Sequence, residues 1–404
     1  MTIKPIPSGY KPSPLGIIPE DWEVKKLGDI AEIGSGGTPS KTHNEYWNGE
    51  IPWITTALLN NPYIETAEEC ISEQGLKNSS AKMLNAGVIL MAMYGQGQTR
   101  GKVSKLLINA TTNQACASID IHTGITDYIH QYLIANYESI RNESNDGNQK
   151  NLSLAIINNI RIAFPPLPEQ HRIVSVLSLW DTAIAKQAQL IEKLTLRKKG
   201  LMQQLLTGKK RLKGFEGEWK EVRLGDVFDE RNETNRDDLP LLSITGDKGV
   251  IYQSESDKRD ISNEDKSKYK RICPNDIGYN TMRMWQGRSA LSELEGIVSP
   301  AYTIVTPKDI IDVRFMAMLI QQPRIVYDFW THSQGLVSDT LNCKYPDFCQ
   351  VKVTIPPKEE QTAIANLFIE IDKEIEIQKQ KLAAMQEQKK GLMQVLLTGR
   401  KRIN

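Results

Sequence analysis

An internal repeat constrains the fold of this chain more than any other feature of its sequence. The segment KKGLMQQLLTGKKR at 198–211 returns as KKGLMQVLLTGRKR at 389–402, with substitutions at only two positions. The offset of 191 residues also holds upstream without a gap, where Glu169 matches Glu360. Because chance does not produce such a match, we expect two copies of one structural unit.

A second, weaker repeat precedes each of these segments. WEVKKLGDIAE begins at Trp22 and WKEVRLGDVFD begins at Trp219, an offset of 197 residues. Between the repeated segments the sequence has diverged, so similar helices separate two dissimilar domains and form one scaffold for two recognition surfaces. The division that we expect is an N-terminal arm (1–21), a first variable domain (22–164), a central helix (165–212), a second variable domain (213–354) and a C-terminal helix (355–404).

The repeated segments read as two long helices with one regular apolar seam each. PPLPEQ and IPPKEEQ supply prolines that stop the preceding chain, followed by glutamates suited to a first helical turn. Residues at alternating steps of four and three form the first seam: Ile173, Leu177, Trp180, Ile184, Gln187, Ile191 and Leu194. The same steps give the second seam: Ile364, Phe368, Ile371, Ile375, Gln378, Leu382 and Met385.

This seam is an a/d heptad pattern, which is typical of a coiled coil. We therefore expect the two helices to pack as an antiparallel pair within a pseudo-two-fold internal repeat. Polar residues interrupt both seams at matching places, Gln187 with Gln378 and Lys198 with Lys389. Such breaks cost stability and can fix register or orientation. The alternative is that each helix packs only on its own domain.

The two variable domains have the composition of mixed α/β domains, which makes the chain α+β overall. Strand-like runs include GVILMAMY at 87–94, AYTIVTP at 301–307 and VKVTIPP at 351–357. Gly, Asn and Thr interrupt them, as loops require.

Two Gly-containing loops carry the candidate DNA-binding residues. The first loop is 95–105, directly after a strand-like run, and the matching loop of the second domain is 279–291. Arginine reads guanine edges and glutamine reads adenine, so these residue types suit direct readout. The candidates are Arg100, Lys102, Lys105, Arg283, Gln286 and Arg288. Each loop is alternatively an ordinary surface hairpin, and the net charge of +1 does not by itself indicate nucleic-acid binding.

Signatures of catalysis occur only as near misses. GQGQTRGK at 95–102 has one residue too many for a phosphate-binding loop, and Val103 replaces the Ser or Thr that would hold magnesium. NNPYIE at 60–65 resembles the catalytic motif of amino-methyltransferases but lacks the second proline. The five histidines show no metal-binding spacing, and the five cysteines form no CxxC pair. We expect no catalytic centre and no metal site in this chain.

The sequence also predicts the compartment. No run of eighteen apolar residues occurs, and the first residues lack the apolar core of a signal peptide. Cysteines without paired spacing are typical of reduced thiols. We therefore expect a cytoplasmic protein without a membrane span.

Taken together, the motifs resemble the specificity subunits of type I restriction-modification systems (the HsdS family). The carrying features are the PPLPEQHRIV and PPKEEQTAIA helix starts, the twin GLMQ-x-LLTG ends and the LGD entries. SGGTPSKTHNEYWNGEIPWIT at 35–55 and LPLLSITGDKGVI at 239–251 resemble recurrent openings of target-recognition domains in that family. The resemblance covers nearly all of the 404 residues.

The resemblance implies a function that the periodicity does not show. Such a subunit reads double-stranded DNA at a bipartite target, two short specific parts separated by a fixed spacer. It joins two methyltransferase subunits, and restriction and motor subunits can then join the complex. S-adenosylmethionine and ATP would bind those partners, and no cofactor would bind this chain. Two alternatives stay open: a coiled-coil scaffold whose side domains bind proteins, and an enzyme with an unrecognised site.

Overall fold

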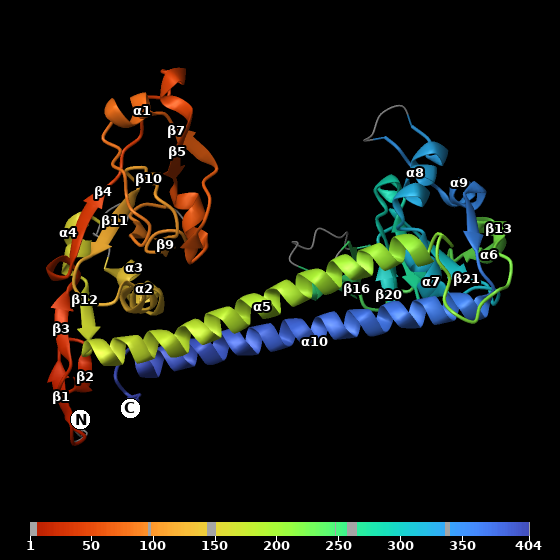
Figure 1. Ribbon diagram of the computed structural model, residues 1–404. Helices are drawn as coiled ribbons and strands as arrows, with labels where there is room; N and C mark the ends of the chain where they lie inside the picture. Colours follow the sequence, from red (N-terminus) through yellow and green to blue (C-terminus); the bar gives the residue numbers. More distant parts are fainter. Residues whose placement is uncertain are drawn as a thin grey trace. The chain divides into compact units, whose positions relative to one another are not determined.

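A computed structural model of the chain describes residues 6–95, 98–143, 151–246, 248–256, 265–335 and 340–403 (Figure 1). Contacts divide the chain into two compact units, Met1–Ala188 with Lys381–Asn404, and Gln189–Gln380. Both long helices, α5 (Leu167–Leu205) and α10 (Lys358–Leu396), run from one unit into the other. Each unit therefore consists of one mixed domain and one segment of each long helix. Within the described residues, no helix has the length and apolar character needed to span a bilayer.

The first unit contains a mixed, mainly antiparallel sheet with several short helices. Its strands are β1 (Tyr10–Ser13), β2 (Gly16–Pro19), β3 (Glu23–Lys26), β4 (Ala31–Ser35), β5 (Trp47–Ile54), β6 (Tyr63–Ile64), β7 (Glu69–Ile71), β8 (Ile89–Ala92), β9 (Val103–Leu106), β10 (Thr111–Thr112), β11 (Cys116–Ile121) and β12 (Arg161–Phe164). Its short helices are η1 (Leu27–Asp29), η2 (Asn44–Tyr46), η3 (Thr56–Asn60), α1 (Glu73–Lys77), α2 (Thr126–Ala135), α3 (Tyr137–Asn142) and α4 (Leu154–Asn159). The largest sheet has the order β4-β11-β8-β9-β6, in which only the β6–β9 pair is parallel.

Strand β8 shows why this sheet is buried on both faces. Side chains alternate across a strand, so its apolar run ILMA serves two cores. Ile89 and Met91 belong to the core that also contains helix α2. Leu90 and Ala92 belong to a second core on the other face, with Ile54 and Leu106. The strand expected at 87–94 is confirmed.

The second unit repeats the central part of this sheet. Its strands are β13 (Lys220–Arg223), β14 (Phe228–Glu230), β15 (Leu242–Thr245), β16 (Gly249–Tyr252), β17 (Lys270–Ile272), β18 (Ile277–Asn280), β19 (Ser289–Leu291), β20 (Gly296–Val298), β21 (Tyr302–Pro307) and β22 (Lys352–Ile355). Its short helices are α6 (Leu224–Val227), η4 (Gln253–Glu255), η5 (Met284–Gln286), α7 (Val313–Leu319), α8 (Pro323–His332) and α9 (Tyr345–Gln350). The order β14-β21-β18-β19 matches β4-β11-β8-β9 of the first unit. Each of the diverged domains therefore contains its own sheet with the same strand order.

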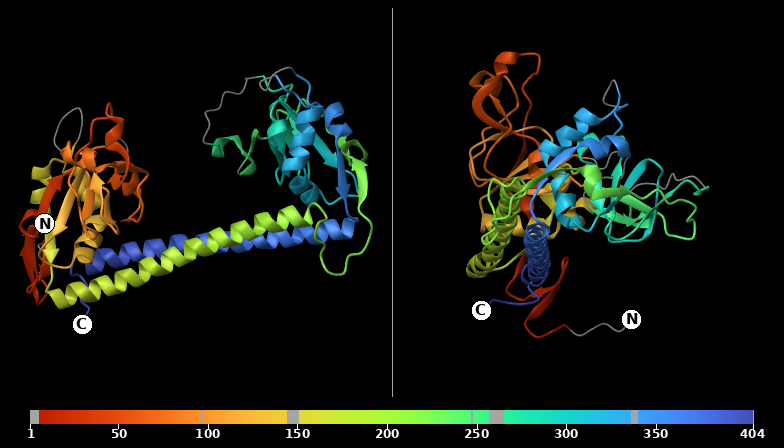
Figure 2. Two further views of the ribbon diagram at one scale, coloured as in Figure 1. Left: turned by 45° about the horizontal axis from the view of Figure 1, so that its top comes forward. Right: turned by 90° about the vertical axis from the view of Figure 1, so that its right-hand side faces the viewer.

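In each unit the two helix segments lie side by side and run antiparallel (Figure 1, Figure 2). In the first unit, Ile173 of α5 and Leu396 near the end of α10 belong to one core. In the second unit, Leu205 near the end of α5 and Phe368 of α10 belong to another. Every one of the fourteen expected seam residues is buried or half-buried, from Ile173 to Leu194 and from Ile364 to Met385. The α+β fold with two long packed helices is confirmed.

In each repeat, a glutamate at the start of one long helix forms an ion pair with an arginine that follows the end of the other long helix. Arg402, beyond the end of α10, pairs with Glu169 in the first turn of α5, with Nη2 2.7 Å from Oε2. In the second unit, Arg211 pairs in the same way with Glu360 at 2.5 Å. Both carboxylates are buried, at 2% and 0% exposure. A buried carboxylate needs such a partner, which explains why both residue types recur in each repeat.

The same carboxylates and the neighbouring glutamines connect the helices to the domains. Trp22 donates its indole N–H to Glu169 over 2.9 Å, at the start of the first domain. Gln170 accepts from the backbone N–H of Ile125, and the matching Gln361 accepts from that of Asp312. The helix starts therefore fix the position of each domain within its own unit.

Candidate nucleic-acid interface

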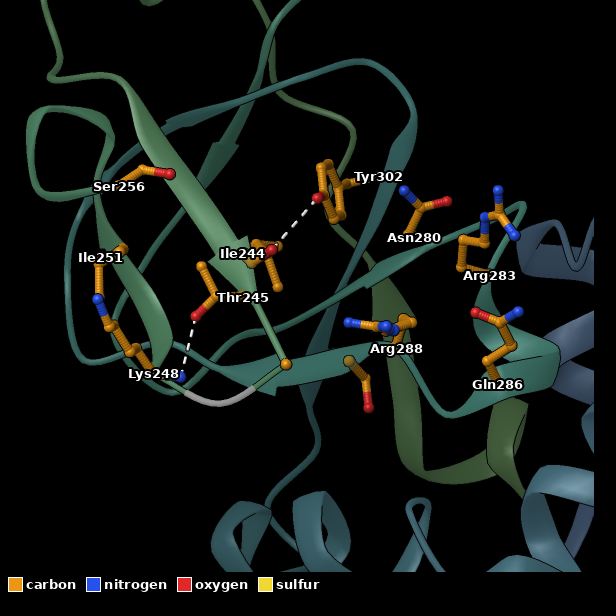
Figure 3. A pocket seen from close by; sticks show the side chains of 12 residues that line it. Ile244, Thr245, Lys248, Ile251, Ser256, Asn280, Arg283, Gln286, Arg288 and Tyr302 are labelled. Carbon is orange, nitrogen blue, oxygen red and sulfur yellow. Dashed lines mark hydrogen bonds between the residues drawn. The ribbon is translucent and has the colours of Figure 1, made fainter. Parts of the chain in front are cut away.

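The second unit holds a cavity of about 650 Å³ beside the β15–β16 hairpin (Figure 3). Ile244, Thr245, Gly246, Lys248 and Ile251 form its hairpin side, and Ser256, Asn280, Arg283, Gln286, Arg288, Ser289 and Tyr302 complete it. None of the described lining residues is acidic. No carboxylate among the described lining residues offsets the charges of Arg283 and Arg288, and the cavity attracts anions such as a phosphate backbone.

The loop between β18 and β19 presents three of the cavity residues together. Gln286 and Arg288 each donate a backbone N–H to the carbonyl of Arg283, over 2.9 and 3.3 Å. Between them Gly287 has a φ of +73°, a left-handed conformation that glycine adopts without a steric penalty. This tight turn places Arg283, Gln286 and Arg288 in the lining of one cavity.

The side chain of Arg288 lies against the hairpin, as Figure 3 shows. A Cβ atom placed on Gly246 would come 2.9 Å from its Nη1. A side chain at position 246 would therefore displace the guanidinium. Arg283 and Gln286 lie on the η5 side of the cavity and are exposed. Among the described residues, the structure records no ion pair for either arginine, so both guanidinium groups face an open cavity.

The structure therefore brings together the three candidates of the second domain. It also adds Lys248, Asn280 and Tyr302, which the sequence did not single out as binding residues. Lys248 lies within LPLLSITGDKGVI at 239–251 and Tyr302 lies within the strand-like run at 301–307, two segments that the sequence marked for other reasons. What the sequence could not show was the tertiary contact that brings the β15–β16 hairpin beside β19 and β20.

The three candidates of the first domain are placed differently. Arg100 is only 9% exposed, and its Nη2 donates to the carbonyl of Arg141 over 3.5 Å. Lys105 pairs with Asp127 at 2.5 Å, and its side chain is 17% exposed. Lys102 alone borders a cavity, where its Nζ donates to the amide oxygen of Asn60 over 2.7 Å. Residues 96–97 of the predicted loop lie outside the described part of the chain.

Nothing in the described ranges groups three or more His, Cys, Asp or Glu side chains in a metal-binding arrangement. The five cysteines are free thiols. Burial raises the pKa of the Cys116 thiol to about 11 and that of Cys343 to about 12, so both remain protonated near neutral pH.

Comparison with known proteins decides the family. Residues 19–196 and 216–387 match the family model for the type I restriction modification DNA specificity domain. These two ranges contain both mixed domains and most of both long helices. The chain belongs to the type I restriction-modification DNA specificity family. It is a specificity subunit, the DNA-recognising and non-catalytic part of a type I restriction-modification enzyme.

Individual relatives agree with this assignment. The chain is 23% identical to the type I restriction enzyme MjaVIII specificity subunit of Methanocaldococcus jannaschii, over 96% of this chain and 94% of that protein. It is 33% identical to the MjaIX specificity subunit of the same organism, over 46% of this chain and 45% of that protein. Both relatives are specificity subunits of type I restriction enzymes, as the family match indicates.

A solved structure shares the fold of this specificity subunit. It comes from a study of complex assembly and conformational transition of the type I restriction-modification system, and its TM-score is 0.61 at 16% identity. The match covers 95% of this chain and 99% of that one. The arrangement of two mixed domains and two long helices is therefore an established fold.

Proposed function

We propose that this specificity subunit reads a bipartite duplex target with two separate domains, 22–164 and 213–354. In the second domain, the cavity lined by Arg283, Gln286 and Arg288 receives the DNA. The observation that carries this proposal is the gathering of these side chains with Lys248 and Asn280 in one cavity whose described lining contains no carboxylate. Arginine pairs with guanine O6 and N7, and glutamine pairs with adenine N6 and N7.

The first domain contributes through a different surface. Of its three candidates, Lys102 is the residue whose position at a cavity suits a DNA contact. Arg100 and Lys105 are better placed to support the loop and sheet edge, because one is buried and the other pairs with Asp127. We therefore assign the first half of the target to the domain as a whole and not to these two side chains.

Substitutions in the cavity test the second domain directly. Arg288→Ala should weaken binding to the specific duplex by about 1–3 kcal/mol and relax one position of the target, if the guanidinium contacts a base. A phosphate contact would instead weaken binding to all sequences about equally and lower the salt dependence. The measurement is fluorescence anisotropy on a set of duplexes, after methylation mapping has identified the target.

A matched control removes an arginine of the same domain that does not line the cavity. Arg236 is paired with Asp238 at 2.7 Å, and Arg236→Gln should leave affinity and sequence preference unchanged. If Arg288→Ala and Arg283→Ala behave like this control at both low and moderate salt, the cavity does not contact DNA.

The same proposal extends to the assembled enzyme. From membership of the specificity family we infer a complex with two methyltransferase subunits, which restriction and motor subunits join. S-adenosylmethionine and ATP then bind those partners, and the cytoplasm is where the complex meets DNA. Co-expression followed by light scattering measures the stoichiometry. A complex containing one methyltransferase subunit per chain would contradict this composition.

The rival function is a coiled-coil scaffold whose side domains bind proteins. It predicts assembly with the partner subunits but no sequence-selective retention of DNA. A gel-shift assay with and without the methyltransferase subunits separates the two functions.

A further inference from the structure

A second cavity, of about 370 Å³, lies in the first unit and has a different character from the cationic one. It is formed by the segment from η3 to β6, strand β9, helices α2 and α3, and one residue each from α5 and α10. Cavities that hold small molecules typically measure about 300–1,000 Å³ and combine apolar walls with a few polar groups. A cavity near the lower limit suits a single heterocycle or a nucleoside.

A half-buried ion pair lines one part of this cavity. Lys389 lies 2.5 Å from Asp181, and the Gln131 amide donates to Asp181 over 2.7 Å and accepts from Lys389 over 3.2 Å. The internal repeat supplies the same pair again as Lys198 and Asp372, at 2.6 Å in the second unit. The second pair is more exposed: Lys198 and Asp372 are 24% and 54% exposed, whereas Lys389 and Asp181 are 13% and 27% exposed. The second pair is not among the residues that line the cationic cavity.

The walls of the cavity are aromatic and aliphatic. Tyr63 and Tyr137 contribute rings, and Leu59, Pro62 and Ile134 contribute apolar surface. The Tyr63 ring packs edge-to-face on His130, with 5.4 Å between ring centroids. Burial raises the pKa of Tyr63 to about 12, so its hydroxyl remains a donor near neutral pH. Flat walls of this kind favour a planar ligand, because stacking on aromatic rings is available to any base.

The asparagines at the rim differ in what they can still bind. Asn60 donates to the carbonyl of Ala57 over 3.0 Å and accepts from Lys102. The Asn61 side chain is exposed, and no hydrogen bond of its amide occurs within the described residues. An amide supplies one donor and one acceptor side by side, which matches N7 and N6 of adenine.

Two backbone carbonyls at the same place already accept hydrogen bonds. The carbonyl of Asn61 accepts from the Ser104 hydroxyl, and the carbonyl of Pro62 accepts from the N–H of Lys105 over 2.9 Å. These two bonds tie the segment before β6 to strand β9. The NNPY sequence resembles a catalytic motif, but here it supplies a wall and a side-chain amide.

We propose that this cavity binds one adenine-type base, with its ring against the wall that contains Tyr63 and Tyr137 and its amino edge on the Asn61 amide. Lys102 at the rim, whose recorded partner is the neutral amide of Asn60, supplies a positive charge for an attached phosphate. The base comes either from a free nucleotide or from an unpaired position in a nucleic acid. This site is separate from the cationic cavity of the second unit and does not depend on the base readout proposed for that cavity, and it shares Lys102 with the DNA contact proposed for the first domain.

Binding of adenosine monophosphate and of an adenine-containing single strand tests the proposal on the full chain, because adenine carries the N6 amino group that Asn61 is expected to hold. Isothermal titration calorimetry measures binding of the monophosphate, and fluorescence anisotropy measures binding of an end-labelled oligothymidylate that contains one adenine. Asn61→Ala should weaken binding about tenfold, because a bidentate base contact is lost. Ile134→Trp should abolish binding by filling the cavity. Asp181→Asn should weaken binding, whereas the matched control Asp372→Asn should have no effect.

Each outcome decides the question. Saturable binding of the monophosphate that weakens about tenfold in Asn61→Ala identifies a free nucleotide as the ligand. Binding of the oligonucleotide alone, with the same loss, identifies an unpaired base. The proposal is overturned if neither probe binds, or if Asn61→Ala and Ile134→Trp both bind like the unsubstituted chain. Since Asn61 is exposed, its variant tests the site even if Ile134→Trp does not fold. Arg288→Ala should not affect either probe, which keeps this test apart from that of duplex recognition.

Discussion

The most unusual single residue is His130, which lies in helix α2 with no exposed surface. Neither ring nitrogen has a hydrogen-bond partner in the described structure. Burial lowers the pKa of His130 from 6.5 to about 4. The positive charges of Lys105 and Lys389 also lower this pKa, whereas the carboxylates of Asp127 and Asp181 raise it. The imidazole is therefore neutral in the folded protein near pH 7.

This predicts a specific loss of stability in mild acid. As the pH falls below about 6.5, the unfolded chain takes up a proton at His130 while the folded chain does not. Stability is complete above this pH and falls until about pH 4, where the folded form also protonates, a loss of roughly 3 kcal/mol in total. His130→Phe keeps a ring against Tyr63 and should remove this part of the pH dependence. Urea unfolding from pH 7 to pH 4 measures it.

His171 provides the control for this measurement, because it is an exposed histidine on α5. His171→Phe should leave the pH dependence of unfolding as it is in the unsubstituted chain. Identical slopes for the unsubstituted chain and His130→Phe would show that the imidazole is hydrated or charged in the folded state.

At the level of elements, the two long helices depend on the charged residues at their ends. Arg402→Met would leave the Glu169 carboxylate buried with the Trp22 indole as its remaining hydrogen-bond partner. Removing one partner of a buried pair is strongly destabilising, and the partial exposure of Arg402 reduces the effect to about 2 kcal/mol. Thermal unfolding and urea unfolding of the full chain measure the change.

A pair on the exposed face of α10 gives the comparison. Lys373 and Glu370 lie 2.8 Å apart with side chains 63% and 69% exposed, so solvent screens their attraction. Lys373→Met should not change the unfolding curve measurably. Equal effects of Arg402→Met and Lys373→Met would mean that the buried carboxylate is not held by the arginine.

The helices also show which parts of the fold the sequence can reveal. Their apolar seam is a local pattern, so spacing alone placed residues such as Ile173 and Phe368 on the packed face. The matching sheets of the two domains could not be predicted, since their strand orders join segments far apart in the chain. The burial of Arg100 was missed for the same reason, because its partner Arg141 lies 41 residues away. The loop from Arg283 to Arg288 was found because one tight turn carries all three side chains.

At the level of the whole molecule, each domain has its own core and its own segment of helix. The core of the first unit includes Trp22 and Ile162 of the domain, Ile173 of α5 and Leu396 of α10. The core of the second unit draws on different residues, among them Phe228 and Phe368. A domain that keeps its contacts with the helix segments of its own unit should therefore be exchangeable without disturbing the other core.

We predict that replacing 22–164 with the corresponding domain of another family member changes one half of the methylated target and leaves the other half intact. The donor must begin with a tryptophan, since Trp22 donates to Glu169, and must end before Pro165, so that the Gln170 side chain still reaches the Pro165 carbonyl. Methylation mapping in cells that carry the complete system reads both halves at once. The reciprocal exchange of 213–354 is the control, and it should alter only the other half. A change in both halves from either exchange would show that the domains do not read DNA independently.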